Sequence, residues 1–280
     1  MIGLAAPDKK FVFTKDDFQS IQDKVYKLAG IHLEDQKTDL VYSRLTKRLR
    51  ELGLTSFQSY LDLVDSPEGA AEIERMLNAL TTNLTSFFRE AHHFDHLKTT
   101  ALGASVERQN GTGRRLRIWS SACSTGEEPY SIAMTLLESP FDLAHADVRI
   151  LATDLNTEVL EQASSGHYSA SVLTKCPDFC RRYVQMNQDG SGVMNSSLRD
   201  LIRFKQLNLL SNWPMKGPFD IIFCRNVLIY FDCETKQRLV DRFVGILKPG
   251  GWLYLGHSES TSGNHPKLES LGHTIYRKML

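Results

Sequence analysis

Small and acidic residues stand together after the first predicted strand of this chain, where a ligand could approach the backbone. Residues 120–131 read SSACSTGEEPYS, and Pro129 suits the first turn of a following helix. The carboxylates of Glu127 and Glu128 would repel a pyrophosphate at a helix N-terminus, and the segment does not match GxGxxG. The loop therefore disfavours NAD or FAD and favours a ligand with an amino group or a sulfonium. The alternative is a tight turn whose acids only complement the helix dipole.

Polar residues also follow two later strands. Asp154 comes after the second predicted strand, where an acid commonly accepts hydrogen bonds from ribose hydroxyls; its alternative role is that of a helix N-cap. Arg225, Asn226 and Tyr230 lie just beyond the apolar strand 219–224, so a role in the core does not account for them. Together, the first loop and Asp154 favour a nucleoside cofactor.

Strand and helix patterns alternate in the region that carries these residues. The expected strands are 116–119, 148–152, 201–207, 219–224 and 252–255, and the expected helices are 127–138, 157–165 and 235–247. This alternation predicts a parallel α/β sheet in a doubly wound, Rossmann-like domain. Ligands in such sheets bind at the carboxyl ends of the strands. Residues 247–251 read LKPGG and predict a turn that returns the chain to the sheet.

Two other regions have their own patterns. Residues 1–90 show helical spacing and no β pattern, which predicts a small all-helical domain; its first helix should begin at a Thr14–Asp17 capping box. A linker helix over 91–113 and the α/β domain over 114–280 would follow. Residues 166–200 are too long for a simple connection, and the Asp-Gly pair at 189–190 predicts a β-hairpin in an inserted antiparallel subdomain.

The composition limits the class of protein. The chain has 280 residues, and its 33 Lys and Arg balance 33 Asp and Glu, which argues against a surface built as a whole to hold nucleic acid. No apolar run approaches the length that spans a bilayer, and the N-terminus lacks a signal-peptide pattern. Five cysteines without a CxxC pair predict reduced thiols. We therefore expect a soluble, cytoplasmic protein.

Longer motifs add a family resemblance. The order strand, acid, strand and LKPGG resembles the class I S-adenosylmethionine-dependent methyltransferase fold. Five segments restrict the resemblance to one family within that class: LTTNLTSFFRE (80–90), SACSTGEEPYSIAM (121–134), ATDLNTEVLEQA (152–163), LNLL (207–210) and FCRNVLIYF (223–231). In this order they are similar to the bacterial chemotaxis receptor methyltransferase family, CheR, over nearly the whole chain.

The resemblance implies an activity and a set of site residues. The activity is transfer of a methyl group from S-adenosylmethionine to glutamate side chains of methyl-accepting chemotaxis receptors, which yields glutamyl methyl esters and S-adenosylhomocysteine. Arg89 and Tyr230 would be the catalytic residues, near the methyl group and the incoming carboxylate, and Asp154 would bind the ribose. The implied cofactor site consists of Asn83, Thr85, Arg89, Glu128, Asp154, Asn208, Leu209, Asn226 and Val227.

Elementary chemistry agrees with this activity. A glutamate side chain has a reference pKa of about 4.3, so the nucleophile is already an anion at neutral pH and needs no general base. The sulfonium is already activated, so the cofactor carries the difficult chemistry. Arg89 could steer the carboxylate and Tyr230 could donate one hydrogen bond to it. The alternative for Arg89 is a salt bridge with Glu90 or an interdomain contact.

His92, His93 and His96 could suggest a metal site. Their spacing supplies no third-ligand pattern, and methyl transfer needs no metal. The favoured interpretation is a set of polar groups on an interdomain helix, and no metal is expected.

A basic segment in the helical domain could bind an acidic partner. Residues 37–50 hold five basic residues against the single acid Asp39. Such a helix face could steer and dock the glutamate-rich receptor helices, or it could simply be solvated. The expected docking residues are Lys37, Arg44, Lys47 and Arg48. Some members of the resembled family also bind a pentapeptide at the receptor C-terminus by strand addition to the β subdomain, and the hairpin allows this here.

Two other functions compete. A nucleic-acid methyltransferase could share the cofactor fold, but zero net charge and the lack of an aromatic-rich basic groove count against it. A cofactor-binding signalling module without catalysis is disfavoured because Arg89, Asp154 and Tyr230 are all present. We expect a monomer that binds no nucleic acid and does not insert into a membrane.

Overall fold

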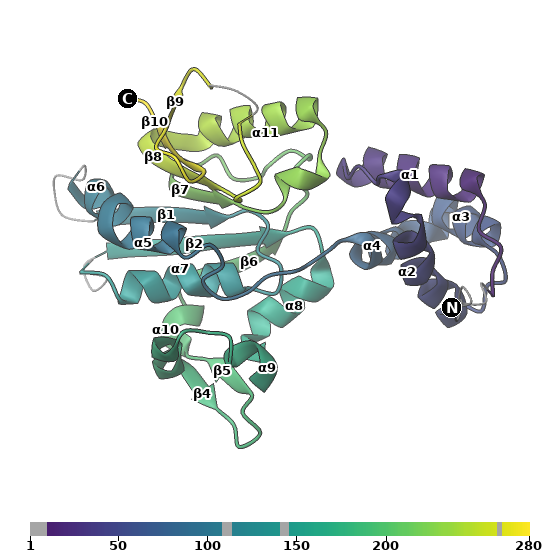
Figure 1. Cartoon of the computed structure of the whole chain (residues 1–280), viewed down its shortest axis with the longest axis horizontal. Helices are drawn as coiled ribbons and strands as arrows, with labels where there is room; N and C mark the ends of the chain where they lie inside the picture. The colour runs from purple at the N-terminus through teal and green to yellow at the C-terminus, as the bar shows by residue number, and fades with distance from the viewer. Residues whose placement is uncertain (1–9, 108–113, 141–145, 262–264) are drawn as a thin grey trace, which may run out of the picture. The chain divides into compact units, whose positions relative to one another are not determined.

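The computed structural model describes residues 10–107, 114–140, 146–261 and 265–280. The chain divides into two compact units, the first ending at Thr82 and the second beginning at Asn83 (Figure 1). This division precedes the expected boundary at residue 90, because the segment after Thr82 bonds to the α/β unit: Ser124 Oγ donates to the Asn83 carbonyl at 3.0 Å. Residues 91–107 of the expected linker helix also belong to the second unit.

The first unit is helical, as predicted. Its helices are α1 (Lys15–Ala29), α2 (Thr38–Glu51), α3 (Phe57–Asp65) and α4 (Ala70–Leu80), with 3-10 turns at Asp35–Lys37 and Pro67–Gly69. The helices bury one apolar face each, and Ile21, Val25, Val41, Leu45 and Tyr60 have no exposed surface.

The capping prediction for α1 is confirmed. Thr14 Oγ1 accepts a hydrogen bond from the Asp17 N–H at 3.1 Å, and Asp17 Oδ2 accepts one from the Thr14 N–H at 2.8 Å. Gly30 ends the helix with φ 67°, a left-handed conformation that glycine adopts without strain.

The second unit contains the predicted doubly wound sheet. Its order is β6-β2-β1-β7-β8-β10-β9, and the strands from β6 to β8 pair in parallel. The strands are β1 (Arg114–Ser120), β2 (Ala146–Asp154), β6 (Ile202–Gln206), β7 (Phe219–Cys224), β8 (Leu247–Leu255), β9 (Leu268–Ser270) and β10 (Ile275–Lys278). The helices are α5 (His92–His96), a π-helical turn (Leu97–Ala101), α6 (Leu102–Glu107), α7 (Glu127–Leu137), α8 (Thr157–Ser165) and α11 (Cys233–Ile246), with a 3-10 turn, η5 (Leu228–Tyr230).

Apolar cores form on both faces of this sheet. Alternate residues of β1 point to opposite faces, so Ile118 packs with residues of α5 and α7, and Trp119 packs with Phe243 of α11. This two-sided burial explains the near-continuous apolar run of β7.

One local prediction is wrong. Residues 247–251 are not a free turn but the beginning of β8. The register against β7 shifts between Phe219 and Ile221, and Gly250 has φ 69°. The LKPGG segment is therefore a bulged part of the strand, in which glycine supplies the unusual backbone angle.

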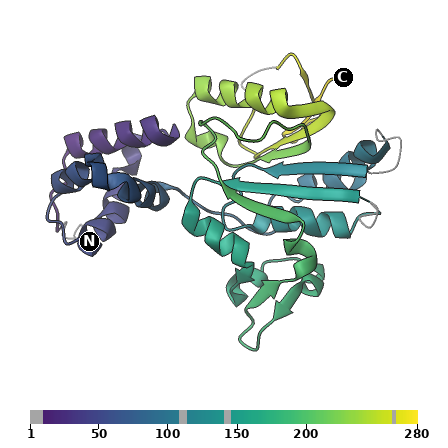
Figure 2. The same cartoon turned by 180° about the vertical axis from the view of Figure 1, so that it is seen from behind.

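The inserted subdomain is a separate small antiparallel sheet, which projects from the main sheet in Figure 2. Its strands are β3 (His167–Tyr168), β4 (Val184–Met186) and β5 (Gly192–Met194), in the order β3-β5-β4, accompanied by α9 (Ala170–Leu173), a 3-10 helix (Asp178–Tyr183) and α10 (Ser196–Arg199). The β4–β5 pairing confirms the predicted hairpin.

The subdomain corrects the cysteine prediction. Cys176 and Cys180 form a disulfide, so they are not reduced thiols as expected. The 3-10 turn that begins at Asp178 folds the chain back within four residues, which sequence spacing alone did not reveal.

Candidate functional site

The loops after β1, β2 and β7 meet at one edge of the sheet, because these parallel strands are neighbours. Backbone hydrogen bonds join them: Ser121 N–H donates to the Phe223 carbonyl and Cys123 N–H to the Thr153 carbonyl, each at 2.9 Å. The structure thus brings together the polar residues that the sequence placed after separate strands.

Asp154 bridges the first two loops. Its Oδ2 accepts the Ser124 N–H at 2.8 Å, and its Oδ1 accepts the Asn156 N–H at 3.0 Å. Asp154 is not the N-cap of α8, because Asn156 has that role and accepts from the Glu158 and Val159 N–H groups. Burial raises the pKa of Asp154, although the backbone donors oppose the shift. Each oxygen keeps a lone pair for a further donor such as a ribose hydroxyl.

The acids of the β1 loop are buried. Glu128 Oε1 accepts from Ser120 Oγ at 2.7 Å, and its Oε2 accepts from Arg225 Nη1 at 2.9 Å. Burial raises the pKa of Glu128, against the opposing effect of Arg225. Glu127 accepts from Thr125 Oγ1 at 2.6 Å, and burial raises its pKa as well. Buried acids at a helix start do more than complement a dipole, and they favour a cationic ligand.

Gly126 is the N-cap of α7 and has φ 98°. A Cβ there would lie 2.8 Å from the Tyr168 hydroxyl and 2.9 Å from the Ala163 Cβ. Tyr168 in turn donates to the Thr125 carbonyl at 2.7 Å. Glycine is therefore required for the loop to pack against the subdomain strand β3.

Arg225 ties the β7 loop to two other segments, which is the role the sequence left open. Its side chain is only 2% exposed; Nη1 bonds to Glu128, and Nη2 lies 3.2 Å from Glu90 Oε2 and donates to the Arg89 carbonyl. Its guanidinium also lies over the Phe94 ring, 5.6 Å from the centroid. Arg225 thereby positions both the Glu128 carboxylate and the backbone of the FFRE segment.

Glu259 is a residue that the sequence reasoning missed. Its Oε2 accepts from the N–H groups of Asn226 and Gly256 at 2.8 and 2.6 Å, and its Oε1 accepts from Ile229 N–H at 3.2 Å. Asn226 has φ 57°, so this buried carboxylate holds the β7 loop in a left-handed conformation that is costly for a non-glycine residue. The sequence could have indicated Glu259 by its position just beyond the carboxyl end of β8, because polar residues at the ends of parallel strands commonly form the site.

The remaining predicted cofactor residues surround these loops. Asn83 accepts from Ser124 through its carbonyl, and Thr85 is half-buried in the same segment. Asn208 Oδ1 accepts from the Leu210 N–H at 2.9 Å. Leu209 is 6% exposed and packs in the core with Val227 at its edge, so a ligand would meet the Leu209 backbone rather than its side chain.

The two predicted catalytic side chains are both half-buried. Arg89 Nη1 donates to the Leu84 carbonyl at 2.9 Å, and the ion pairs of Glu90 among the described residues are with His93 and Arg225. Tyr230 ends the turn η5, and its N–H donates to the Val227 carbonyl at 3.2 Å. Each therefore lies on a segment that the Arg225 and Glu259 contacts hold.

The predicted docking residues on α2 differ from one another. Arg44 Nη1 donates to the carbonyls of Ala79, Leu80 and Thr81 at 3.1, 3.0 and 2.7 Å, which satisfies the end of α4. Arg48 pairs with the buried Glu72 at 2.8 Å. Lys47 is 79% exposed, and Lys37 is half-buried.

A doubly wound sheet with an acid after β2 and buried acids after β1 agrees with a class I S-adenosylmethionine-dependent methyltransferase. Two family models match the chain: "CheR methyltransferase, SAM binding domain" over residues 83–277 and "CheR methyltransferase, all-alpha domain" over residues 16–81. The chain belongs to the CheR methyltransferase family.

Relatives match most of the chain. A "Probable chemotaxis protein methyltransferase" of Rhizobium etli is 45% identical over 258 residues, which cover 90% of this chain and 96% of the relative. "Chemotaxis protein methyltransferase 2" of Pseudomonas aeruginosa is 43% identical over 276 residues, covering 96% and 95%. The "Chemotaxis protein methyltransferase" of Escherichia coli is 45% identical over 264 residues, covering 92% and 89%.

One structural observation concerns the expectation that the protein does not insert into a membrane. Among the helices of the described ranges, none is long and apolar enough to cross a bilayer.

Proposed function

We propose that this chain is a cytoplasmic protein-glutamate O-methyltransferase that methylates glutamate side chains of chemotaxis receptors. The observation that carries the proposal is the acid-lined strand-end site built from Glu127, Glu128 and Asp154, in which Arg225 is the only buried guanidinium among the described residues. Such a site suits a cationic sulfonium cofactor. The names of the relatives support a role in chemotaxis.

The residues present fit the cofactor. Asp154 would accept the ribose hydroxyls through its remaining lone pairs. Glu128 and the backbone of Asn226 would line the part of the site next to Arg225. When bound, S-adenosylmethionine supplies a methyl group that its sulfonium already activates for transfer. Burial raises the pKa of Glu128 and of Asp154. The positive charge of the bound cofactor would stabilise both carboxylates in their charged form.

The chain then has two tasks toward the substrate. Arg89 would orient the incoming glutamate carboxylate by charge-assisted hydrogen bonds, and the Tyr230 hydroxyl would donate one further hydrogen bond. Neither residue acts as an acid or a base, because the carboxylate is already ionised at neutral pH. Holding the oxygen in line with the methyl carbon can supply roughly 7–11 kcal/mol in well-oriented systems.

The test uses the full chain, methyl-tritiated S-adenosylmethionine and membranes that contain chemotaxis receptors. We expect label in a receptor band that alkali releases as volatile methanol, because methyl esters are labile to base. Alkali-stable label would contradict the ester, and label transferred to added RNA would favour the nucleic-acid alternative.

A variant pair sharpens this test. Arg89→Ala should lower turnover strongly while leaving the fold intact, because its side chain bonds only to the Leu84 carbonyl among the described residues. Arg203→Ala, an exposed arginine on β6, is the matched control and should keep full turnover. Equal turnover in the two variants would remove Arg89 from the proposed site.

For receptor docking we propose the α2 face with Lys37 and Lys47 as the contacting cations. Arg44 and Arg48, which were expected beside them, already satisfy carbonyls and a buried acid within the first unit. They would fix the helix that presents the lysines.

The β subdomain is proposed to bind the receptor's C-terminal pentapeptide by strand addition. Two short strands, β3 and β4, form its edges, and Met186 on β4 is 47% exposed. A surface hollow of about 660 Å³ adjoins these strands, lined by His167, Ser169, Ala170, Asn187, Gln188, Asp189 and Ser191. Isothermal titration calorimetry with the pentapeptide and with a scrambled version tests this. Saturable heat of binding from the pentapeptide alone supports the tether, and equal heats from both peptides contradict it.

A further inference from the structure

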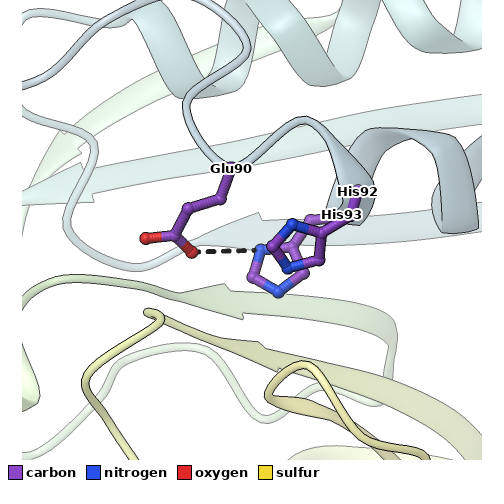
Figure 3. Close-up of side chains that lie close together, drawn as sticks. All are labelled: Glu90, His92 and His93. Carbon is purple, nitrogen blue, oxygen red and sulfur yellow. Dashed lines mark ion pairs between the residues drawn. The ribbon is translucent and has the colours of Figure 1, made fainter.

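Three side chains lie close together near the start of α5, and Figure 3 shows the Glu90 carboxylate pointing toward the rings of His92 and His93. One ligand atom from each residue lies within 4.8 Å of the others. The atoms Glu90 Oε2, His92 Nε2 and His93 Nδ1 are all buried and have no hydrogen-bond partner among the described residues. Buried polar atoms without hydrogen bonds are costly, so this place favours a ligand, although Glu90 Oε2 already has an ion pair with Arg225 Nη2 at 3.2 Å.

His93 is prepared to bind through Nδ1. Its side chain has no exposed surface, and its Nε2 lies 2.9 Å from the His273 carbonyl. Because a carbonyl can only accept, the proton must be on Nε2, which leaves a lone pair on Nδ1. Burial, together with the Arg225 charge, lowers the pKa of His93 to about 4, so the ring is neutral at neutral pH. A metal-binding histidine commonly donates its other N–H to a backbone carbonyl in this way.

Glu90 divides its two oxygens between separate tasks. Its Oε1 accepts from Asn226 Nδ2 and from the His257 N–H, each at 3.2 Å. Its Oε2 faces the histidines, 3.5 Å from His93 Nδ1. Burial opposes ionisation of Glu90, but Arg225 and these donors outweigh it and lower its pKa. The carboxylate is therefore charged when a cation arrives.

We propose that Glu90, His92 and His93 form a binding site for a divalent transition-metal ion of the Zn²⁺ type. Two imidazoles and one carboxylate are a common donor set for zinc. With bonds of about 2.1 Å, two ligand atoms of a tetrahedral zinc are roughly 3.4 Å apart. The 3.5 Å between Glu90 Oε2 and His93 Nδ1 matches that separation.

The structure also changes which histidines are involved. Sequence reasoning grouped His92 and His93 with His96 and found no third ligand. His96 instead bonds to the Tyr254 hydroxyl through Nδ1 at 2.8 Å, and Glu90 occupies the third position. Spacing alone did not group Glu90 with the two histidines, because an acid two residues before the pair joins it only through the left-handed backbone at Glu90, φ 58°.

Arg225 is the group that opposes this site. Its Nη2 lies 3.2 Å from Glu90 Oε2, although the geometry is not that of a hydrogen bond. Glu128 compensates the Arg225 charge at 2.9 Å, so Glu90 remains available to a second cation. The metal must compete with Arg225 for this oxygen, and we therefore expect moderate rather than tight affinity.

Direct metal binding tests the proposal without receptor or cofactor, so the result is independent of the proposed activity. The full chain is freed of metal with EDTA and titrated with Co²⁺ and then with Zn²⁺. We expect one saturable site with the visible absorption of tetrahedral Co²⁺, and Zn²⁺ should displace the Co²⁺. His92→Ala should weaken binding at least tenfold, whereas His32→Ala, an exposed histidine of the first unit, should not change it.

A measurement on the unaltered chain protects the test from a misfolded variant. Zn²⁺ should shift the ring-nitrogen NMR signals of two of the nine histidines, including one whose Nε2 carries a slowly exchanging proton. Absence of a saturable site would overturn the proposal. Water, and not a metal ion, would then be the partner of the three atoms. Binding that His92→Ala leaves unchanged, with shifts in other histidines, would overturn it equally.

Discussion

Two arginines, one in each unit, make similar ion pairs with buried glutamates, and the pairs have different consequences. Arg48 pairs with Glu72 and joins α2 to α4 inside a helical bundle. Arg225 pairs with Glu128 and joins loops at the carboxyl ends of β7 and β1. The first pair stabilises a scaffold, whereas the second positions a site. Charge alone does not distinguish the two; the location relative to the strand ends does.

The largest expected effect is a loss of folding stability when Arg48 of the first unit is replaced. Arg48→Ala leaves Glu72 buried, with the Tyr60 hydroxyl as its remaining close donor at 3.0 Å. Removing one partner of a buried pair costs about 3–5 kcal/mol, so the first unit should unfold at lower urea concentration. Circular dichroism during urea unfolding measures this. Lys47→Ala, at a site 79% exposed, should change stability by less than about 0.5 kcal/mol, and an equal loss in both variants would contradict the role of the pair.

The second prediction separates the arginines by activity. Arg225→Lys keeps the charge but loses the planar fork that contacts Glu128, the Arg89 carbonyl and Glu90. We expect kcat/KM for S-adenosylmethionine to fall about 100-fold, equivalent to about 2.7 kcal/mol. Arg48→Lys is the matched variant in the first unit and should stay within about twofold of the parent. Similar losses in both would remove the contrast between scaffold and site.

Glu259 offers a smaller effect through the loop it holds. In Glu259→Gln the amide group turns two donors toward the N–H groups of Asn226, Gly256 or Ile229. The β7 loop should loosen, and KM for the cofactor should rise about 20-fold with a smaller change in kcat. Steady-state kinetics measure this split, and Glu234→Gln, an exposed acid of α11, is the control. A purely structural role would instead lower the active fraction with KM unchanged.

The smallest expected effect tests the docking face proposed on α2. Lys47→Glu combined with Lys37→Glu, the two lysines of the proposed docking face, should raise KM for receptor about fivefold at low salt and leave cofactor KM unchanged. The difference should shrink at high salt, because exposed charges are screened. Initial rates at two ionic strengths measure it. If cofactor KM rose in parallel, the docking face would be excluded.

Much of the fold followed from local patterns. The Thr14–Asp17 box and Gly30 specify both ends of α1 through contacts within four residues. Alternating strand and helix patterns predicted the parallel sheet, and the strand-end rule located Glu128, Asp154 and Asn226. These predictions succeeded because capping, periodicity and strand ends are properties of neighbouring residues.

The sequence by itself thus determined the elements, their order, the family and the strand ends that bear polar residues. Only the tertiary structure decided the partners: Arg225 meets Glu128 across 97 residues, and Arg44 meets the Leu80 carbonyl across 36. It also placed Glu259 under the β7 loop and turned Glu90 toward His93. The physical reason is that partner choice for a charged side chain depends on burial and on long-range packing, which leave no periodic trace in the chain.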